Sequence, residues 1–109
     1  MNKLTSRQRK ELRSLAHHMD SIVKIGKQGV TDQLIKAIGT ALEDHELIKV
    51  KFVDHKDEKN SLVPQIAEKC SAEIVGTIGN IIILFKENSD PEKRKIKVYL
   101  ESNNRDLFR

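Results

Sequence analysis

The residues best suited to chemistry in this chain are two glycines that flank a lysine and a glutamine, Gly26-Lys27-Gln28-Gly29. A β-branched run, Ile22–Ile25, precedes them, and a helix-like pattern begins at Thr31. Glycine accepts positive φ and lets the backbone approach a ligand closely, because it has no Cβ. Free amides at a helix start favour an anion, and Lys24 and Lys27 add positive charge. The pattern therefore predicts either a phosphate-binding loop or an ordinary strand-to-helix turn.

A second Gly-x-x-Gly tetrad, Gly76-Thr77-Ile78-Gly79, lies between two apolar runs. It contains no cation, and no helix pattern begins after it, so no helix dipole would point at a ligand. Its Gly79-Asn80 step is a good hairpin signal. We therefore interpret this tetrad as β-hairpin geometry and not as a second binding loop.

The elements that must position these loops follow from hydrophobic periodicity, which predicts the order α-β-α-β-α-β-β. The segments expected as helices run from the capping box at Thr5 to His18, from Thr31 or Asp32 to His45, and from Ser61 to Cys70; the strands are 21–25, 47–53, 73–77 and 81–85. This alternation is typical of an α/β fold with a mixed four-stranded sheet. The length of 109 residues suits one domain, which we place at residues 1–98 with a poorly ordered tail at 99–109.

Several details of these elements can be tested. The apolar stripe of the first helix is expected to be Leu12, Leu15, Ala16 and Met19. Pro64 should lie in the first turn of the third helix, where proline is tolerated. Residues 47–53 should have one apolar and one basic face, the basic one formed by Lys49 and Lys51. A further edge strand is expected around Ile96, Val98 and Leu100.

Charge is distributed unevenly along the chain. Residues 1–30 carry seven Lys or Arg against two acids and residues 91–109 carry six against three, whereas the middle is mildly acidic. Basic flanks attract polyanions, usually nucleic acid, although a solubilising surface would look the same. No apolar run approaches a membrane span, and the N-terminus does not resemble a signal peptide. Together with a single cysteine, Cys70, this favours the cytoplasm.

Three segments, IGKQGVT, ALEDHELIKVKF and VGTIGNIIILFKE, resemble the CRM domain (chloroplast RNA splicing and ribosome maturation) in its stand-alone bacterial YhbY-like form. The resemblance covers roughly residues 3–98. It implies a two-layer, KH-like α/β fold, RNA binding through the GxxG loop and nearby basic surface, and association with 23S-type ribosomal RNA in precursors of the large subunit. The chain has Phe85-Lys86 where the family usually shows Tyr-Arg.

The predicted RNA-binding residues are the loop and the cations around it: Gly26, Lys27, Gln28, Gly29, Lys24, Arg9, Lys10 and Arg13. Lys49 and Lys51 would join them if their strand face is open. This set can act together only if the first helix and the loop share one surface. A monomer without cofactor or metal is expected.

Other functions are less well supported by the residues. The histidines His17, His18, His45 and His55 lack metal-ligand spacing. We expect His55 to be exposed in its charged loop, His45 to be a helix terminus or a core histidine, and Cys70 to be core, so catalysis is not predicted. The first helix has few Asn or Gln for reading DNA bases. Two alternatives remain: a general structured-RNA chaperone, or a protein that binds ribosomal or translation proteins through its acidic segments 43–46 and 54–58.

Overall fold

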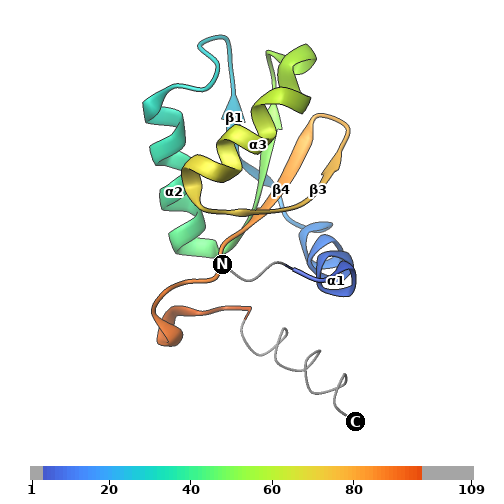
Figure 1. Cartoon of the computed structure of the whole chain (residues 1–109), viewed down its shortest axis with the longest axis vertical. Coiled ribbons are helices and arrows are strands. Elements are labelled where there is room, and N and C mark those ends of the chain that lie inside the picture. Colours follow the sequence, from blue (N-terminus) through green and yellow to red (C-terminus); the bar gives the residue numbers. More distant parts are fainter. Residues whose placement is uncertain (1–3, 97–109) are drawn as a thin grey trace.

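The computed structural model describes residues 4–96, which fold into one α/β unit (Figure 1). The elements in chain order are α1 (Ser6–Ala16), β1 (Ser21–Ile25), α2 (Asp32–His45), β2 (Leu47–Phe52), a 3-10 turn (Lys56–Glu58), α3 (Lys59–Cys70), β3 (Glu73–Ile78), β4 (Ile81–Phe85) and a second 3-10 turn (Pro91–Lys93). This confirms the predicted order of helices and strands. No helix among the described residues is long and apolar enough to cross a membrane.

The four strands form one sheet in the order β1-β2-β4-β3. β1 pairs with β2 in parallel, and β4 pairs with both β2 and β3 in antiparallel fashion, so the predicted mixed sheet is confirmed. The parallel pair needs a crossover, which α2 supplies. The β3–β4 hairpin turns at Gly79-Asn80, where Gly79 has φ 58°.

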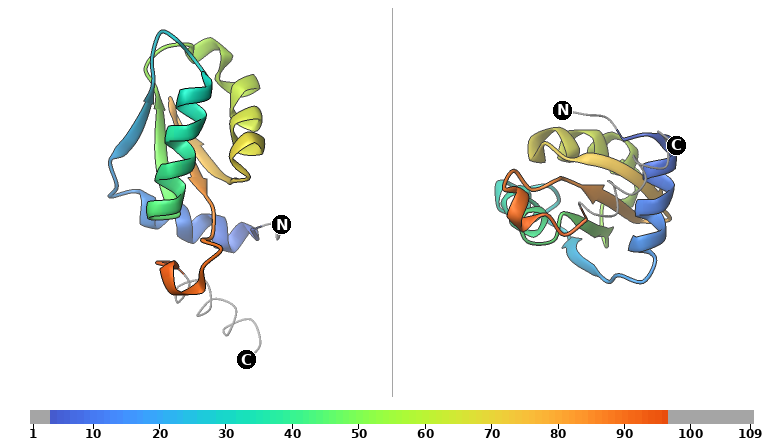
Figure 2. Two further views of the ribbon diagram at one scale, coloured as in Figure 1. Left: turned by 90° about the vertical axis from the view of Figure 1, so that its left-hand side faces the viewer. Right: turned by 90° about the horizontal axis from the view of Figure 1, so that it is seen from below.

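Two helices, α2 and α3, cover one face of the sheet, which we call the inner face (Figure 2). The core between them consists of Ile25, Ile38, Ala41, Leu42, Ile48, Val50, Phe52, Val63, Ile66, Ala67, Cys70, Ala72, Ile82 and Leu84. Alternate residues of β2 and β4 supply the sheet side of this core, because successive side chains of a strand point to opposite faces.

Helix α1 runs across part of the opposite face, which we call the outer face (Figure 2). Its Leu12 and Ala16 join a second cluster with Leu4, Leu47, Val75, Ile83 and Phe85. The two-layer arrangement thus describes the sheet with α2 and α3, and α1 adds a partial cover on the second face. Leu15 is 43% exposed, so its predicted place in the buried stripe is wrong. A helix that crosses a sheet singly buries a narrow stripe, and Leu15 lies at its margin.

The helix starts follow the local signals. Thr5 Oγ1 accepts a bond from the Gln8 N–H at 3.1 Å, and Gln8 Oε1 accepts from the Thr5 N–H at 3.0 Å, so the predicted capping box is confirmed. Thr31 caps α2 by accepting from the Leu34 N–H at 3.1 Å. The Thr31 cap fixes where the loop between β1 and α2 must end.

Two boundary predictions are corrected. Helix α3 begins at Lys59, before the expected Ser61, because the 3-10 turn leads directly into it. Pro64 therefore lies inside the helix and not in its first turn. Pro64 has no N–H to donate to the carbonyl of Asn60, four residues earlier in the helix. Asn60 is exposed, so water can solvate that carbonyl instead. At the C-terminal end Ile96 lies in a bend, and the rest of the expected edge strand and the predicted tail lie outside the described residues.

Candidate nucleic-acid interface

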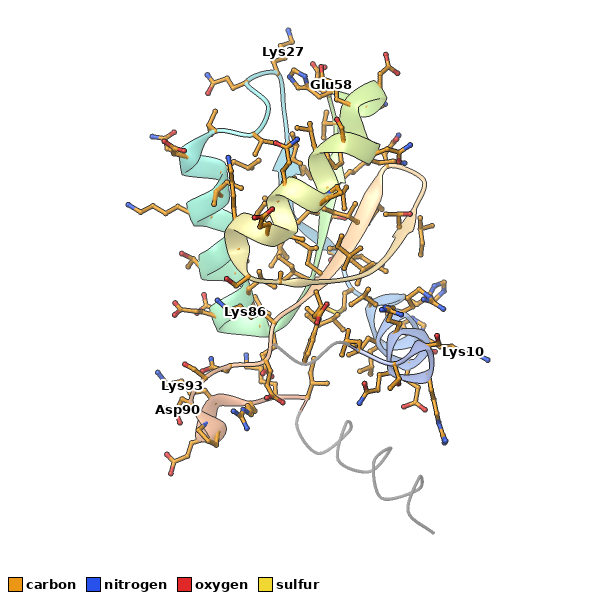
Figure 3. All side chains as sticks on the ribbon, in the orientation of Figure 1. Lys10, Lys27, Glu58, Lys86, Asp90 and Lys93 are labelled. Atoms are coloured by element: carbon orange, nitrogen blue, oxygen red, sulfur yellow. The ribbon has the colours of Figure 1, made fainter. Side chains whose placement is uncertain are left out.

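The Gly26–Gly29 segment, called the GKQG loop below, forms a tight turn at the end of β1. The Gly29 N–H donates to the Gly26 carbonyl at 3.0 Å, and Gly29 has φ 71°. Gly26 has no positive φ, and a Cβ added to it would meet nothing within 4 Å. Left-handed freedom is thus required only at Gly29. The side chains of Lys27 and Gln28 are exposed, and Lys27 points into solvent at one end of the domain (Figure 3).

His55 supports the GKQG loop from the β2–α3 connection. Its Nε2 lies 2.8 Å from the Lys27 carbonyl oxygen, and its ring lies 3.3 to 3.6 Å from where a Cβ on Gly29 would be. Its side chain is 29% exposed, so the expectation of a simply exposed histidine is wrong. The bond to the Lys27 carbonyl raises the pKa of His55; desolvation opposes the shift, and Glu58 and Asp54 support it.

The start of α2 offers less to an anion than the sequence suggested. Thr31 already caps the Leu34 amide, and Asp32 places a carboxylate in the first turn. A carboxylate there competes with any other anion for the positive end of the helix dipole. Attraction for a phosphate therefore depends mainly on the lysines near the loop.

Two of these lysines lie side by side on the outer face next to the GKQG loop. Lys24 of β1 is the register partner of Lys51 of β2, and both side chains are exposed. Ile81 of β4 and Ile78 of β3 continue this row of paired residues across the sheet, and Ile78 is 52% exposed. We call Lys24, Lys51, Ile81 and Ile78 the outer row. Lys51 thus meets the condition of an open strand face.

Lys49 does not meet that condition. Its residue is 9% exposed, and its Nζ donates to the Met19 carbonyl at 3.0 Å and the His17 carbonyl at 3.4 Å. It therefore binds the carbonyls that follow α1, where a cation suits the helix dipole. The condition that the basic face of residues 47–53 is open therefore fails at Lys49, because the residues that end α1 cover it.

The basic residues of α1 lie away from the GKQG loop. Figure 3 shows Lys27 at one end of the domain and Lys10 on α1, toward the other end. Lys10 is exposed and Arg9 is half-buried. The structure therefore divides the predicted binding residues into a loop group, which gains Lys51, and an α1 group.

Arg13, in the last turn of α1, has a structural contact of its own. Its Nη1 donates to the Val75 carbonyl at 3.3 Å, and its Cδ lies 2.9 Å from where a Cβ on Gly76 would be. Gly76 of the second tetrad therefore makes room for the arginine stem, and Gly79 shapes the hairpin turn. Gly76 lies two residues before Ile78 on β3. The Arg13 side chain, which packs against Gly76, therefore lies next to the outer row. An elongated ligand would have to cross the outer face to reach both groups.

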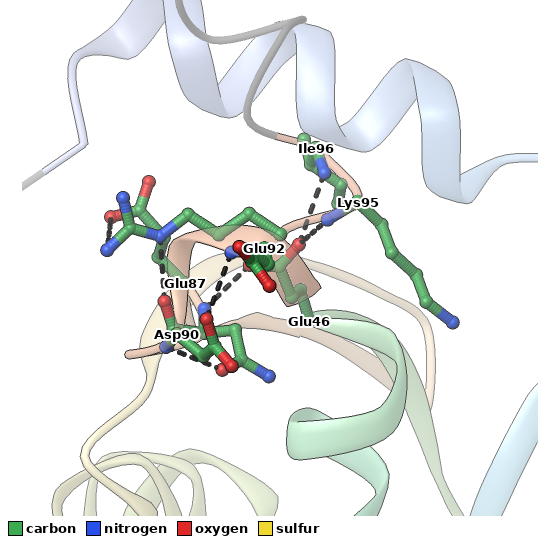
Figure 4. Close-up of polar contacts among 8 residues, drawn as sticks. Glu46, Glu87, Asp90, Glu92, Lys95 and Ile96 are labelled. Carbon is green, nitrogen blue, oxygen red and sulfur yellow. Dashed lines mark hydrogen bonds and ion pairs between the residues drawn. The ribbon is translucent and has the colours of Figure 1, made fainter.

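Glu46 is buried, although its acidic segment, residues 43–46, was expected at the surface. It is 1% exposed, and its carboxylate accepts from the N–H groups of Asn88, Lys95 and Ile96 at 2.6, 2.5 and 3.1 Å (Figure 4). It thereby binds the segment after β4 to the end of α2. Its burial removes one carboxylate from the proposed protein-binding surface, and nothing in its local sequence separates it from exposed Glu43.

Two further titratable candidates, His45 and Cys70, lie where the sequence placed them. His45 is the exposed last residue of α2, as one of its two predicted placements required. Cys70 is buried in the inner core, as predicted, and this burial raises the pKa of its thiol. Among residues 4–96 there is no cluster of three or more His, Cys, Asp or Glu suited to holding a metal ion.

The fold and the loop together define a small α/β domain with a glycine-flanked, cationic strand-to-helix turn. Residues 4–86 match the CRS1 / YhbY (CRM) domain, and the chain belongs to this family. It is 42% identical over 88 residues to the "Probable RNA-binding protein YqeI" of Bacillus subtilis, covering 80% of this chain and 92% of that protein. It is 34% identical over 91 residues to an "RNA-binding protein" of Haemophilus influenzae, covering 83% and 92%.

A solved structure agrees with this assignment. The solution structure of a Staphylococcus aureus protein, described there as a candidate RNA binding protein, is similar with a TM-score of 0.71 and 38% identity. The match covers 84% of this chain and 97% of the other. These relatives are named as RNA-binding proteins and not as enzymes, in agreement with the expectation that the chain is not an enzyme.

Proposed function

We propose that this protein is a non-catalytic, cytoplasmic RNA-binding protein that binds 23S-type ribosomal RNA in precursors of the large ribosomal subunit. The GKQG loop is the primary contact, and Lys24 and Lys51 extend it over the outer face. The observation that carries the proposal is the exposed Lys27-Gln28 tip on a turn that His55 and Gly29 keep closed. The names of the relatives support RNA as the ligand.

The chemistry of this surface suits a phosphate backbone better than base edges. Lysine is a point charge with rotatable donors and gives affinity without a fixed geometry. Gln28 can donate to a phosphate or sugar oxygen, or bond a base edge. The aliphatic residues of the outer row, Ile78 and Ile81, offer apolar contact but no aromatic stacking platform. We therefore expect recognition of RNA shape and backbone, with weak preference for sequence.

The matched test is sedimentation of cell extracts on a sucrose gradient, with detection of the protein in each fraction. Wild type, Gly26→Asp, Lys27→Glu and the control Lys69→Glu are compared. Gly26 has open space for a side chain, so Gly26→Asp should fold normally. Lys69 is an exposed lysine in the last turn of α3, and its variant makes the same charge change as Lys27→Glu away from the loop.

We expect wild type and Lys69→Glu to migrate with precursors of the large subunit, and both loop variants to leave those fractions. Wild type at the top of the gradient would refute the ribosomal assignment. Unchanged migration of Gly26→Asp and Lys27→Glu would show that the RNA site lies elsewhere on the protein. Binding of the purified variants to ribosomal RNA transcripts separates loss of RNA affinity from loss of a protein contact.

A further inference from the structure

We propose that His55 is a positioning residue for the GKQG loop: its imidazole holds the Lys27 carbonyl and thereby orients the peptide units that present Lys27 and Gln28. The contact itself is independent of any ligand. Its effect on RNA affinity rests on the proposed function of the loop.

The ring contacts both sides of the turn. On one side Nε2 lies 2.8 Å from the Lys27 carbonyl oxygen. On the other side the ring occupies the space beside Gly29, where a Cβ would approach Nε2 to 3.3 Å. Because Lys27 and Gly29 flank Gln28, the imidazole constrains the backbone of the tip. The side chains of Lys27 and Gln28 are exposed and are open to a ligand.

His55 is itself held in place by its own connection. Its N–H donates to Asp54 Oδ1 at 2.8 Å, and its carbonyl accepts from the Glu58 N–H at 3.1 Å. The Val53 and Asp54 N–H groups donate to the Ile25 carbonyl at 2.9 and 3.0 Å, which joins this connection to the end of β1. His55 has φ 57°, a left-handed conformation that histidine adopts more readily than most residues. Such a conformation persists only where surrounding contacts impose it.

Protonation should strengthen this support. The charged groups that face the ring are Glu58, whose Oε1 lies 3.6 Å from Nδ1, and Asp54; the GKQG loop presents the Lys27 carbonyl. The neutral Nε2–H tautomer donates to Lys27 but turns an Nδ1 lone pair toward the Glu58 carboxylate. The imidazolium donates from both nitrogens, to Lys27 and to Glu58.

The sign of the pH dependence follows from the raised pKa of His55 in the folded protein. The added stabilisation is complete below the unfolded value of about 6.5 and is lost as pH rises through the higher folded pKa. The loop should therefore be most ordered at mildly acidic pH. The bond from the neutral Nε2–H tautomer remains above that range, so the loop keeps part of its support.

The test compares wild type with His55→Leu, His55→Gln and the control His45→Gln, free of RNA, from about pH 5.5 to about pH 8. The readout is hydrogen exchange of the Gly29 amide, which is bonded to the Gly26 carbonyl. We expect His55→Leu to lower its protection about five- to tenfold, the upper part of the range for one hydrogen bond. His55→Gln can still donate to Lys27, so it should restore much of the protection without its pH dependence. His45→Gln should leave both unchanged, since His45 is exposed at the end of α2.

The affinity of each variant for labelled single-stranded oligouridine is then measured beside Lys27→Glu. We expect His55→Leu to weaken binding about five- to tenfold, with His55→Gln intermediate. The proposal would be overturned if His55→Leu leaves the protection of the Gly29 amide unchanged. It would also be overturned if His55→Leu loses that protection but binds RNA normally, while Lys27→Glu binds weakly. If Lys27→Glu binds normally, the loop is not the RNA site, and the proposed function fails separately from the His55 contact.

Discussion

The two glycines of the GKQG loop should respond in opposite ways to the same substitution. Gly29→Ala forces a Cβ into a left-handed position, which costs about 1 kcal/mol. The new Cβ would lie 3.3 Å from His55 Nε2, so the ring must shift and its bond to Lys27 weakens, at a cost of about 1 kcal/mol. We expect a loss of about 2 kcal/mol, or about 8–15 °C in Tm. Gly26→Ala meets open space without positive φ and should stabilise the protein by about 0.5 kcal/mol.

The assay is thermal and urea unfolding of both single variants, monitored by circular dichroism. A double-mutant cycle with His55→Ala separates the two causes, because removal of the ring should recover about 1 kcal/mol of the Gly29→Ala penalty. The backbone part of the penalty should remain in that background. If Gly29→Ala and Gly26→Ala unfold within about 0.5 kcal/mol of each other, the left-handed turn and its contact with His55 are not as described.

Two further predictions concern other parts of the molecule. Glu46→Gln replaces the carboxylate that accepts three backbone N–H bonds with an amide, so the free energy of unfolding should fall by about 2–3 kcal/mol. The control Glu43→Gln, at an exposed side chain, should change that free energy by less than about 0.5 kcal/mol. Equal melting curves for the two variants would contradict the role of the buried carboxylate. The logarithm of the association constant for oligouridine should fall with the logarithm of the salt concentration, at a slope of about −0.7 per phosphate contacted. Lys24→Ala and Lys51→Ala should each make that slope shallower. An affinity that does not depend on salt would exclude binding through the phosphate backbone.

Local patterns predicted the elements and the loop well. The capping box of Thr5 and Gln8 is confirmed, and of the two candidate caps for the second helix, Thr31 and Asp32, the structure selects Thr31. The run Ile81–Phe85 was predicted as a strand, and it forms β4, whose last four residues are buried. Such features depend on residue propensity, hydrophobic periodicity and neighbours within one helical turn, and all three can be taken directly from the local sequence.

Local patterns did not predict the surroundings of side chains that contact distant segments. Lys49 alternates with apolar neighbours, and the sequence left open whether its strand face is accessible; the carbonyls of His17 and Met19 bind it from across the fold. Leu15 was expected in the core, but α1 buries only Leu12 and Ala16 fully and leaves Leu15 exposed. Hydrophobic periodicity shows which residues share a face of a helix or strand. It does not show how much of that face another element covers.

The sequence by itself determined the order of the helices and strands, the position of the GKQG turn and the family to which the chain belongs. Only the tertiary structure decided that α1 and the loop lie apart, that Lys51 and not Lys49 faces solvent, and which distant groups support the loop and the end of α2. His55 and Lys27 are 28 residues apart, Glu46 and Ile96 are 50, and Arg13 and Val75 are 62. The physical reason is that such contacts form only when packing of the two apolar faces of the sheet brings remote segments together, and no local propensity encodes that geometry.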